Sequence, residues 1–124
     1  MSLLSSYVTM LLVSAPGDER VIKQESDYGI INHLIGVRSM LVPLTPRLGA
    51  FVDPRKSISY TGILYTPMAT QPTRLSVHGK FVVVAYEKGH PDSLNSFDIA
   101  KFHKLYRAIS HGCEIKEVSA TPEA

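Results

Sequence analysis

Hydrophobic and polar residues alternate most clearly between residues 95 and 112, with the period of an α-helix. At about 100° per residue, one side of this segment is apolar and the opposite side is basic. The apolar arc holds Ile99, Phe102, Leu105, Tyr106 and Ile109, and the basic arc holds Lys101, His103, Lys104, Arg107 and His111. The pattern predicts a helix that ends at Gly112 and presents a cationic side to solvent or to an anionic partner.

Runs rich in β-branched and aromatic residues predict strands along much of the remaining chain. We expect strands at residues 6–14, 20–24 and 75–87, shorter ones between the prolines at 39–42, 48–52 and 57–65, and a last one at 113–118. The continuous apolar run at 81–84 is typical of a central strand covered on both faces. Residues 64–73 are expected to form an exposed connection.

Turn and capping residues divide the chain between these elements. Ser26 or Asp27 is suited to cap a short helix that carries Ile30, Ile31, Leu34 and Ile35 and ends at Gly36. Pro16-Gly17 and Asp53-Pro54-Arg55-Lys56 predict turns. The predicted fold is α+β: a single domain at residues 1–118, with an antiparallel sheet of about five strands packed with two helices. Residues 119–124 are expected to form a flexible tail.

Composition supports one hydrophobic core and places positive charge in the middle of the chain. The 124 residues are 44% hydrophobic, which is enough for one domain of this size. Residues 37–91 carry seven basic and two acidic side chains, although the net charge of the whole chain is only +2. The apolar run at residues 7–13 lacks a basic flank and is too short to span a bilayer. We therefore expect a soluble protein or one peripheral to a membrane.

Catalytic and metal-binding patterns are weak in this sequence. His111-x-Cys113, with His103 nearby, is the one grouping that suggests a thiol catalyst or a metal, but zinc sites need four ligands at regular spacing. Asp98 is better explained as a helix cap than as a catalytic acid. We expect no catalytic residue, no metal, no cofactor and no small-molecule substrate. A small enzyme using Cys113 stays as a third hypothesis.

Basic side chains are the strongest candidates for a binding surface. Lys101, Lys104 and Arg107 are spaced three apart and would form a ridge on the predicted helix, while Arg47, Arg55 and Lys56 lie in predicted loops. These six residues could contact phosphates or acidic lipid head groups. Lysines on a solvated helix surface are an equally simple reading. Tyr60, Tyr65 and Phe51 could stack on bases, or belong to the core.

The order of elements resembles that of matrix proteins of non-segmented negative-strand RNA viruses, of the rhabdovirus type. An opening strand at 7–13, a turn with Arg20 and a helix at 26–35 are followed by Gly79-Lys80-Phe81 in a strand, Asn95-Ser96-Phe97 opening a helix, and Gly112-Cys113-Glu114 in a closing strand. The resemblance covers about half of the chain. Two features depart from the family: no basic tail precedes the first strand, and neither Pro-Pro-x-Tyr nor Pro-Thr-Ala-Pro occurs.

The resemblance implies a non-enzymatic structural protein of the virion, which forms homo-oligomers. Such a protein would lie in the host cytoplasm or against the inner face of a membrane, and would contact an anionic membrane surface, RNA or nucleoprotein. A small nucleic-acid-binding module that uses the same basic residues is the alternative. Without the resemblance, we expect a soluble cytoplasmic protein.

Overall fold

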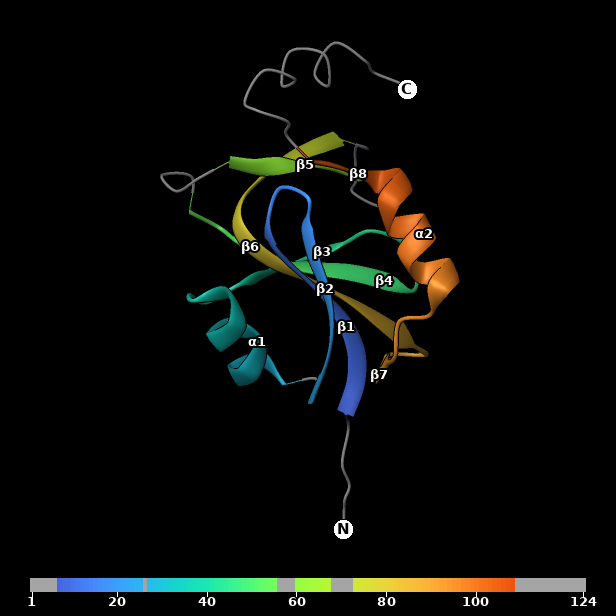
Figure 1. The fold of residues 1–124 in the computed structure, drawn as a ribbon. Coiled ribbons are helices and arrows are strands. Elements are labelled where there is room, and N and C mark those ends of the chain that lie inside the picture. Colours follow the sequence, from blue (N-terminus) through green and yellow to red (C-terminus); the bar gives the residue numbers. More distant parts are fainter. Residues whose placement is uncertain (1–6, 26, 56–59, 68–72, 109–124) are drawn as a thin grey trace.

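The computed structural model describes residues 7–25, 27–55, 60–67 and 73–108, which form a strand-rich fold with two helices (Figure 1). Its elements are β1 (Tyr7–Ala15), β2 (Asp18–Glu25), α1 (Tyr28–Ile35), β3 (Met40–Pro43), β4 (Leu48–Asp53), β5 (Tyr60–Thr66), β6 (Thr73–Glu87), β7 (His90–Asp92), α2 (Ser96–Leu105) and β8 (Tyr106–Ala108). The predicted single small domain with an antiparallel sheet and two helices is confirmed, but the sheet has eight strands rather than about five.

The long strand β6 organises the sheet, as its apolar run predicts. The strands follow the order β2-β1-β6-β4-β3, and β5 and β7 also pair with β6. The first part of β6 pairs with β5, while residues 81–83 lie between β1 and β4. The two parts meet at Gly79, whose φ of 70° suits a residue without a side chain. Residues 81–84 are all buried, so the expectation of a central strand is confirmed.

Two hydrophobic clusters lie on opposite faces of the sheet, each covered by one helix (Figure 1). Successive β6 residues point to alternate faces, so Phe81 and Val83 join one cluster while Val82 and Val84 join the other. Phe102 of α2 packs into the first cluster, and Ile31 of α1 packs into the second. The face covered by α2 is called the α2 face below.

The first helix forms as its capping residues predict. Asp27 is the N-cap and accepts a hydrogen bond from the Gly29 amide, and Gly36 ends the helix with a φ of 101°. The hairpin before it is also confirmed, with Gly17 at a φ of 78° between β1 and β2. Both helix ends were readable because each depends on one local residue type.

The two short strands β7 and β8 were missed. Lys88 and Gly89 both have positive φ, which makes the two-residue hairpin turn that returns β7 along β6. Residues 64 and 65, which the predicted strand at 57–65 and the predicted connection at 64–73 share, belong to β5 together with Thr66, and Leu64 is fully buried. Residues 68–72 and the predicted strand at 113–118 lie outside the described residues.

The second helix ends earlier than predicted, at Leu105 rather than Gly112. Tyr106 takes an extended conformation, with φ −122° and ψ 135°, and pairs with Leu64 in the β5–β8 ladder. Its ring stacks on Phe102 at 5.1 Å between centroids and meets Phe81 edge-on at 5.2 Å. This burial of an aromatic ring outweighs the local preference for continuing the helix.

Candidate anionic-surface interface on α2

The amino end of α2 is fixed by a capping box. The Asn95 side chain accepts a hydrogen bond from the Asp98 amide, and the Asp98 carboxylate accepts one from the Asn95 amide, each at 2.9 Å. These bonds satisfy two backbone donors that a helix start leaves open. The expected capping role of Asp98 is therefore confirmed, and the helix starts where the sequence indicates.

Arg47 ties this helix start to the sheet. Its guanidinium donates two hydrogen bonds to Asp98, from Nε at 2.9 Å and from Nη2 at 3.0 Å. It also donates to Asp92 at 2.9 Å, to the Ser93 carbonyl at 3.0 Å and to Glu87 at 3.3 Å. Four segments of the chain thus meet at one cation: the start of β4, the ends of β6 and β7, and the start of α2.

Charge pairing in this cluster shifts the pKa values of its members. Burial alone would raise the pKa of Asp98, but hydrogen bonds from Arg47 and from the Asn95 amide outweigh it and lower that pKa. The hydrogen bond from Arg47 is also the main cause that lowers the pKa of Asp92. The same bonds raise the pKa of Arg47 itself. Arg47, predicted to bind an anionic partner, is instead occupied by carboxylates of its own chain.

The outward side of α2 carries an aromatic ring and two lysines in one line. Phe97 is 83% exposed, the largest value among the described large hydrophobic residues. Lys101 and Lys104, both exposed, follow four and seven positions later. On a helix these spacings place the three side chains within about 60° of one another, and roughly 100° to 160° around the helix from the buried Phe102. We call Phe97, Lys101 and Lys104 the outer stripe.

The lysines of the outer stripe have no ion pair with any described residue, whereas Arg47 and Arg55 do. Phe97 was absent from the predicted site because sequence reasoning counted only charge on this side of the helix. The spacing of Phe97 with Lys101 and Lys104 could have found it, since i, i+4 and i+7 share a face.

Arg107 does not lie on α2 with Lys101 and Lys104, although the spacing of three predicted that the three residues would form one ridge. It lies on β8, directly opposite Ile63 of β5, and it is exposed. Opposed residues of an antiparallel pair share a face, and so do residues two apart on one strand. Arg107 therefore shares a face with Tyr65, which is 41% exposed, and with Arg74, the residue opposite Tyr65 on β6.

Arg55 is held by its own turn. Its guanidinium donates to both carboxylate oxygens of Asp53, at 3.0 Å and 2.7 Å, and its amide donates to the same side chain at 2.9 Å. The side-chain bond from Arg55 is the largest cause that lowers the pKa of Asp53. These bonds hold Arg55 against Asp53, but Lys56, the last residue of the predicted turn, lies outside the described residues, so the turn stays a prediction.

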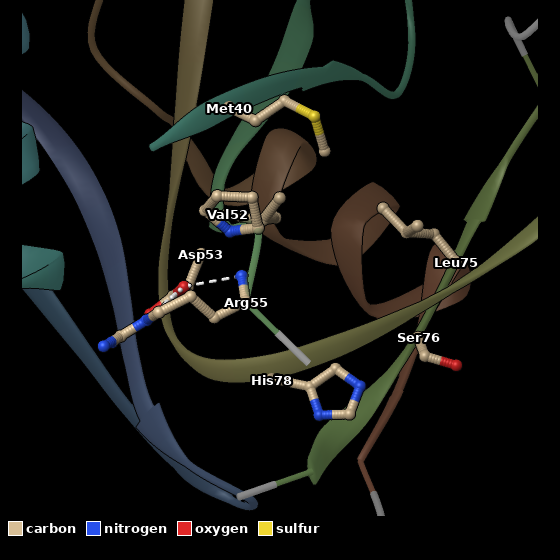
Figure 2. A pocket seen from close by; sticks show the side chains of 8 residues that line it. Met40, Val52, Asp53, Arg55, Leu75, Ser76 and His78 are labelled. Atoms are coloured by element: carbon tan, nitrogen blue, oxygen red, sulfur yellow. Dashed lines mark hydrogen bonds and ion pairs between the residues drawn. The ribbon is translucent and has the colours of Figure 1, made fainter. Parts of the chain in front are cut away.

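A shallow pocket adjoins this turn, and Figure 2 shows Arg55 folded back onto Asp53 at its edge. Met40, Val52, Leu75 and His78 also line it. Its volume of about 30 Å³ is room for roughly one or two waters and not for an organic substrate. We assign the pocket no ligand.

Aromatic residues that were candidates for base stacking divide into buried and exposed. Phe51 is buried in the cluster under α1, where the ring of Tyr28 meets it edge-on at 5.2 Å. Tyr60 is partly buried and meets His78 at 5.4 Å. Tyr65 alone of the three keeps a substantial exposed surface.

Residues 7–25, 27–55, 60–67 and 73–108 contain no cluster of three or more His, Cys, Asp or Glu side chains that could hold a metal ion. His103 instead contacts Glu19 of β2, with 2.7 Å between Nε2 and Oε1. His111 and Cys113 lie outside the described residues, so the thiol hypothesis stays a prediction.

Within the same part of the chain, neither helix has the length and apolar character needed to cross a bilayer. Comparison with known proteins found no match among family models, curated proteins or solved structures.

Proposed function

We propose that this protein is a non-enzymatic structural protein that binds an anionic membrane surface through the outer stripe and that associates with itself. The observation that carries the membrane role is the exposure of Phe97 in line with Lys101 and Lys104. A single exposed aromatic ring is common on soluble proteins, but a ring in line with two lysines matches the rings and basic side chains that a bilayer interface accommodates together.

The expected strength of binding follows from the two kinds of side chain. Each lysine near an anionic bilayer contributes about 1 kcal/mol, and full burial of a phenylalanine ring about 1.5–3 kcal/mol. One outer stripe therefore gives weak, reversible attachment that falls with salt. The carboxylates around Arg47 add negative charge near the amino end of α2, so the electrostatic attraction is expected from Lys101 and Lys104, while Phe97 supplies the apolar contact.

Flotation with vesicles tests the proposal. The wild-type chain should float with vesicles containing phosphatidylserine and stay behind with neutral ones. Lys101→Glu with Lys104→Glu should reduce binding by about 30-fold or more, since each lost lysine removes roughly 1 kcal/mol. The matched control is Arg38→Glu with Lys80→Glu, which changes the net charge equally at two exposed positions away from α2. Equal losses in both pairs would contradict the role of the outer stripe.

Nucleic-acid binding is the second candidate, and the face shared by Tyr65, Arg74 and Arg107 favours it. An exposed tyrosine that shares a face with two arginines resembles the stacking platforms of single-strand binders. Affinity for a single-stranded oligonucleotide should then fall steeply with salt and drop after Tyr65→Ala. Equal affinity of Tyr65→Ala and the wild-type chain would eliminate this platform.

A further inference from the structure

The strand β2 forms one end of the sheet and offers a long edge. It pairs with β1 over its whole length, and no other described strand pairs with it. Its eight residues therefore leave one row of backbone amides and carbonyls without a strand partner in the described part of the chain. Edges of this kind are templates for pairing with another strand unless charge or shape prevents it.

Side chains on the α2 face of this edge alternate in charge around one apolar residue. Glu19, Val21 and Lys23 lie opposite Val13, Leu11 and Thr9 of β1, which places them on that face. Val21 is 57% exposed although its neighbour Leu11 is buried. A valine between an acid and a base is complemented by an antiparallel strand that carries a base, an apolar residue and an acid in that order.

The same strand of a second copy has that reversed pattern. A two-fold axis normal to the sheet keeps every side chain on its own face, so one residue must pair with itself. With Val21 at the axis, Glu19 lies opposite Lys23 of the second copy, and this attraction occurs twice. With Ile22 at the axis, Glu19 would oppose Glu25, and with Arg20 there, two arginines would meet. With Gln24 there, Lys23 would oppose Glu25, but only residues 23–25 of the two strands would overlap. Charge complementarity and the length of the overlap together select Val21.

We infer that two copies of this chain join their β2 edges antiparallel, with Val21 at the two-fold axis. The inference rests on the proposed self-association and names the surface that performs it. Because the axis is normal to the sheet, both copies present α2 on the same side of the joined sheet. Two outer stripes then reach one membrane together, which turns two weak contacts into a stronger bivalent one.

This dimer is expected to be weak. One pair of strand edges buries less than the roughly 1,600 Å² of a standard stable interface. Association should therefore be visible by sedimentation only at high protein concentration, and should strengthen on anionic vesicles that gather the copies.

Complementary charge reversals provide the test. Glu19→Lys alone places lysines opposite lysines, and Lys23→Glu alone places acids opposite acids, so neither variant should dimerise with itself. A mixture of the two variants restores both attractions. We expect each single variant to raise the dissociation constant at least tenfold, and the mixture to sediment as the wild-type chain does.

Controls separate this effect from damage to the fold. Glu19→Lys also removes the contact with His103, so His103→Ala is the matched control and should still dimerise. Val21→Lys, at an exposed position, should abolish dimers without lowering the melting temperature. Circular dichroism checks that every variant is folded.

Three results would overturn the inference. Self-association unchanged in all variants would place the contact elsewhere and leave the proposed self-association standing. A wild-type chain that stays monomeric to about millimolar concentration and on vesicles would remove both. If both single variants still formed assemblies larger than a dimer, the copies would be joined by a head-to-tail contact instead of a two-fold one.

Discussion

At the scale of single residues, buried carboxylates decide where the cations of this protein are used. Asp98 is only 8% exposed at its side chain, and Arg47 neutralises it while also bonding Asp92. An unpaired carboxylate there would be costly, so the arginine is committed to the fold. Lys101 and Lys104 have no such ion pair among the described residues, and we therefore propose them as contacts for an external partner.

Removing the Arg47 cation should destabilise the protein and change its response to acid. Arg47→Gln is expected to lower the free energy of unfolding by about 2–3 kcal/mol, at the low end for a broken buried pair because the cluster is partly exposed. Urea unfolding measures this loss. Arg38→Gln, at an exposed cation, should change stability by less than about 0.5 kcal/mol.

The acid response has a definite sign. The folded-state pKa values of Asp53, Asp92 and Asp98 lie below the ordinary value of 3.8, so their contribution is fully present above that pH. Stability of the wild-type chain should therefore fall as the pH drops below 3.8. Arg47→Gln removes the main cause of two of these shifts and should flatten the decline. An equally steep decline in the variant would contradict this account.

Two glycines should differ sharply in their tolerance of a methyl group. A Cβ at Gly62 would lie 2.6 Å from the Arg107 carbonyl and 3.0 Å from the Ala108 Cα, where β5 and β8 meet. A Cβ at Gly49 would come closest to the flexible end of Leu41, at 2.9 Å, and would lie at ordinary contact distance, 3.6 Å, from the Val42 carbonyl oxygen. Gly62→Ala should cost about 2 kcal/mol and Gly49→Ala less than about 1 kcal/mol, by urea unfolding. Equal costs would argue against the β5–β8 pairing.

At the scale of elements, the sequence predicts features that depend on neighbouring residues, but it does not predict pairing between strands far apart in the chain. The Asn95–Asp98 capping box and the Gly36 helix end follow from residue type and spacing, as does the central position of β6. The end of α2 at Leu105 depends on Tyr106 finding Leu64, which lies 42 positions earlier in the sequence. No local pattern encodes that contact.

The residues of the candidate surface also divide into those that local spacing predicts and those that depend on long-range contacts. The two lysines of the outer stripe could be predicted because helical spacing is local, but Arg107 could not be separated from them without knowing where the helix ends. Arg47 looked like a loop cation because its carboxylate partners are 40 to 51 residues away in sequence.

The cap of α2 should matter for stability, whereas the outer stripe should not. Asn95→Ala removes the side-chain acceptor for the Asp98 amide and is expected to lower stability by about 1 kcal/mol. Phe97→Ser alters a side chain that packs little and should change stability by less than about 0.5 kcal/mol. Thermal melting followed by circular dichroism compares the two. A larger loss in Phe97→Ser would mean that Phe97 serves the core rather than a partner.

At the scale of the whole molecule, the sheet, the β2 edge and α2 together determine which way the outer stripe faces. The sheet buries the apolar side of α2, so that the outer stripe points away from the core. Pairing of two β2 edges would set two such stripes on the same side. The proposed function therefore depends on one arrangement: an exposed ring and two lysines without an ion pair to any described residue, on a helix held by its cap and by Arg47.

The most direct measurement uses a reporter at the ring itself. The chain contains no Trp, so Phe97→Trp introduces a single indole at the outer stripe, and Tyr65→Trp introduces one on the other candidate face. With phosphatidylserine vesicles, the emission of Phe97→Trp should shift to the blue and be quenched by brominated lipid, while that of Tyr65→Trp should not change. An unshifted, unquenched indole at position 97 in protein that floats with the vesicles would contradict the account.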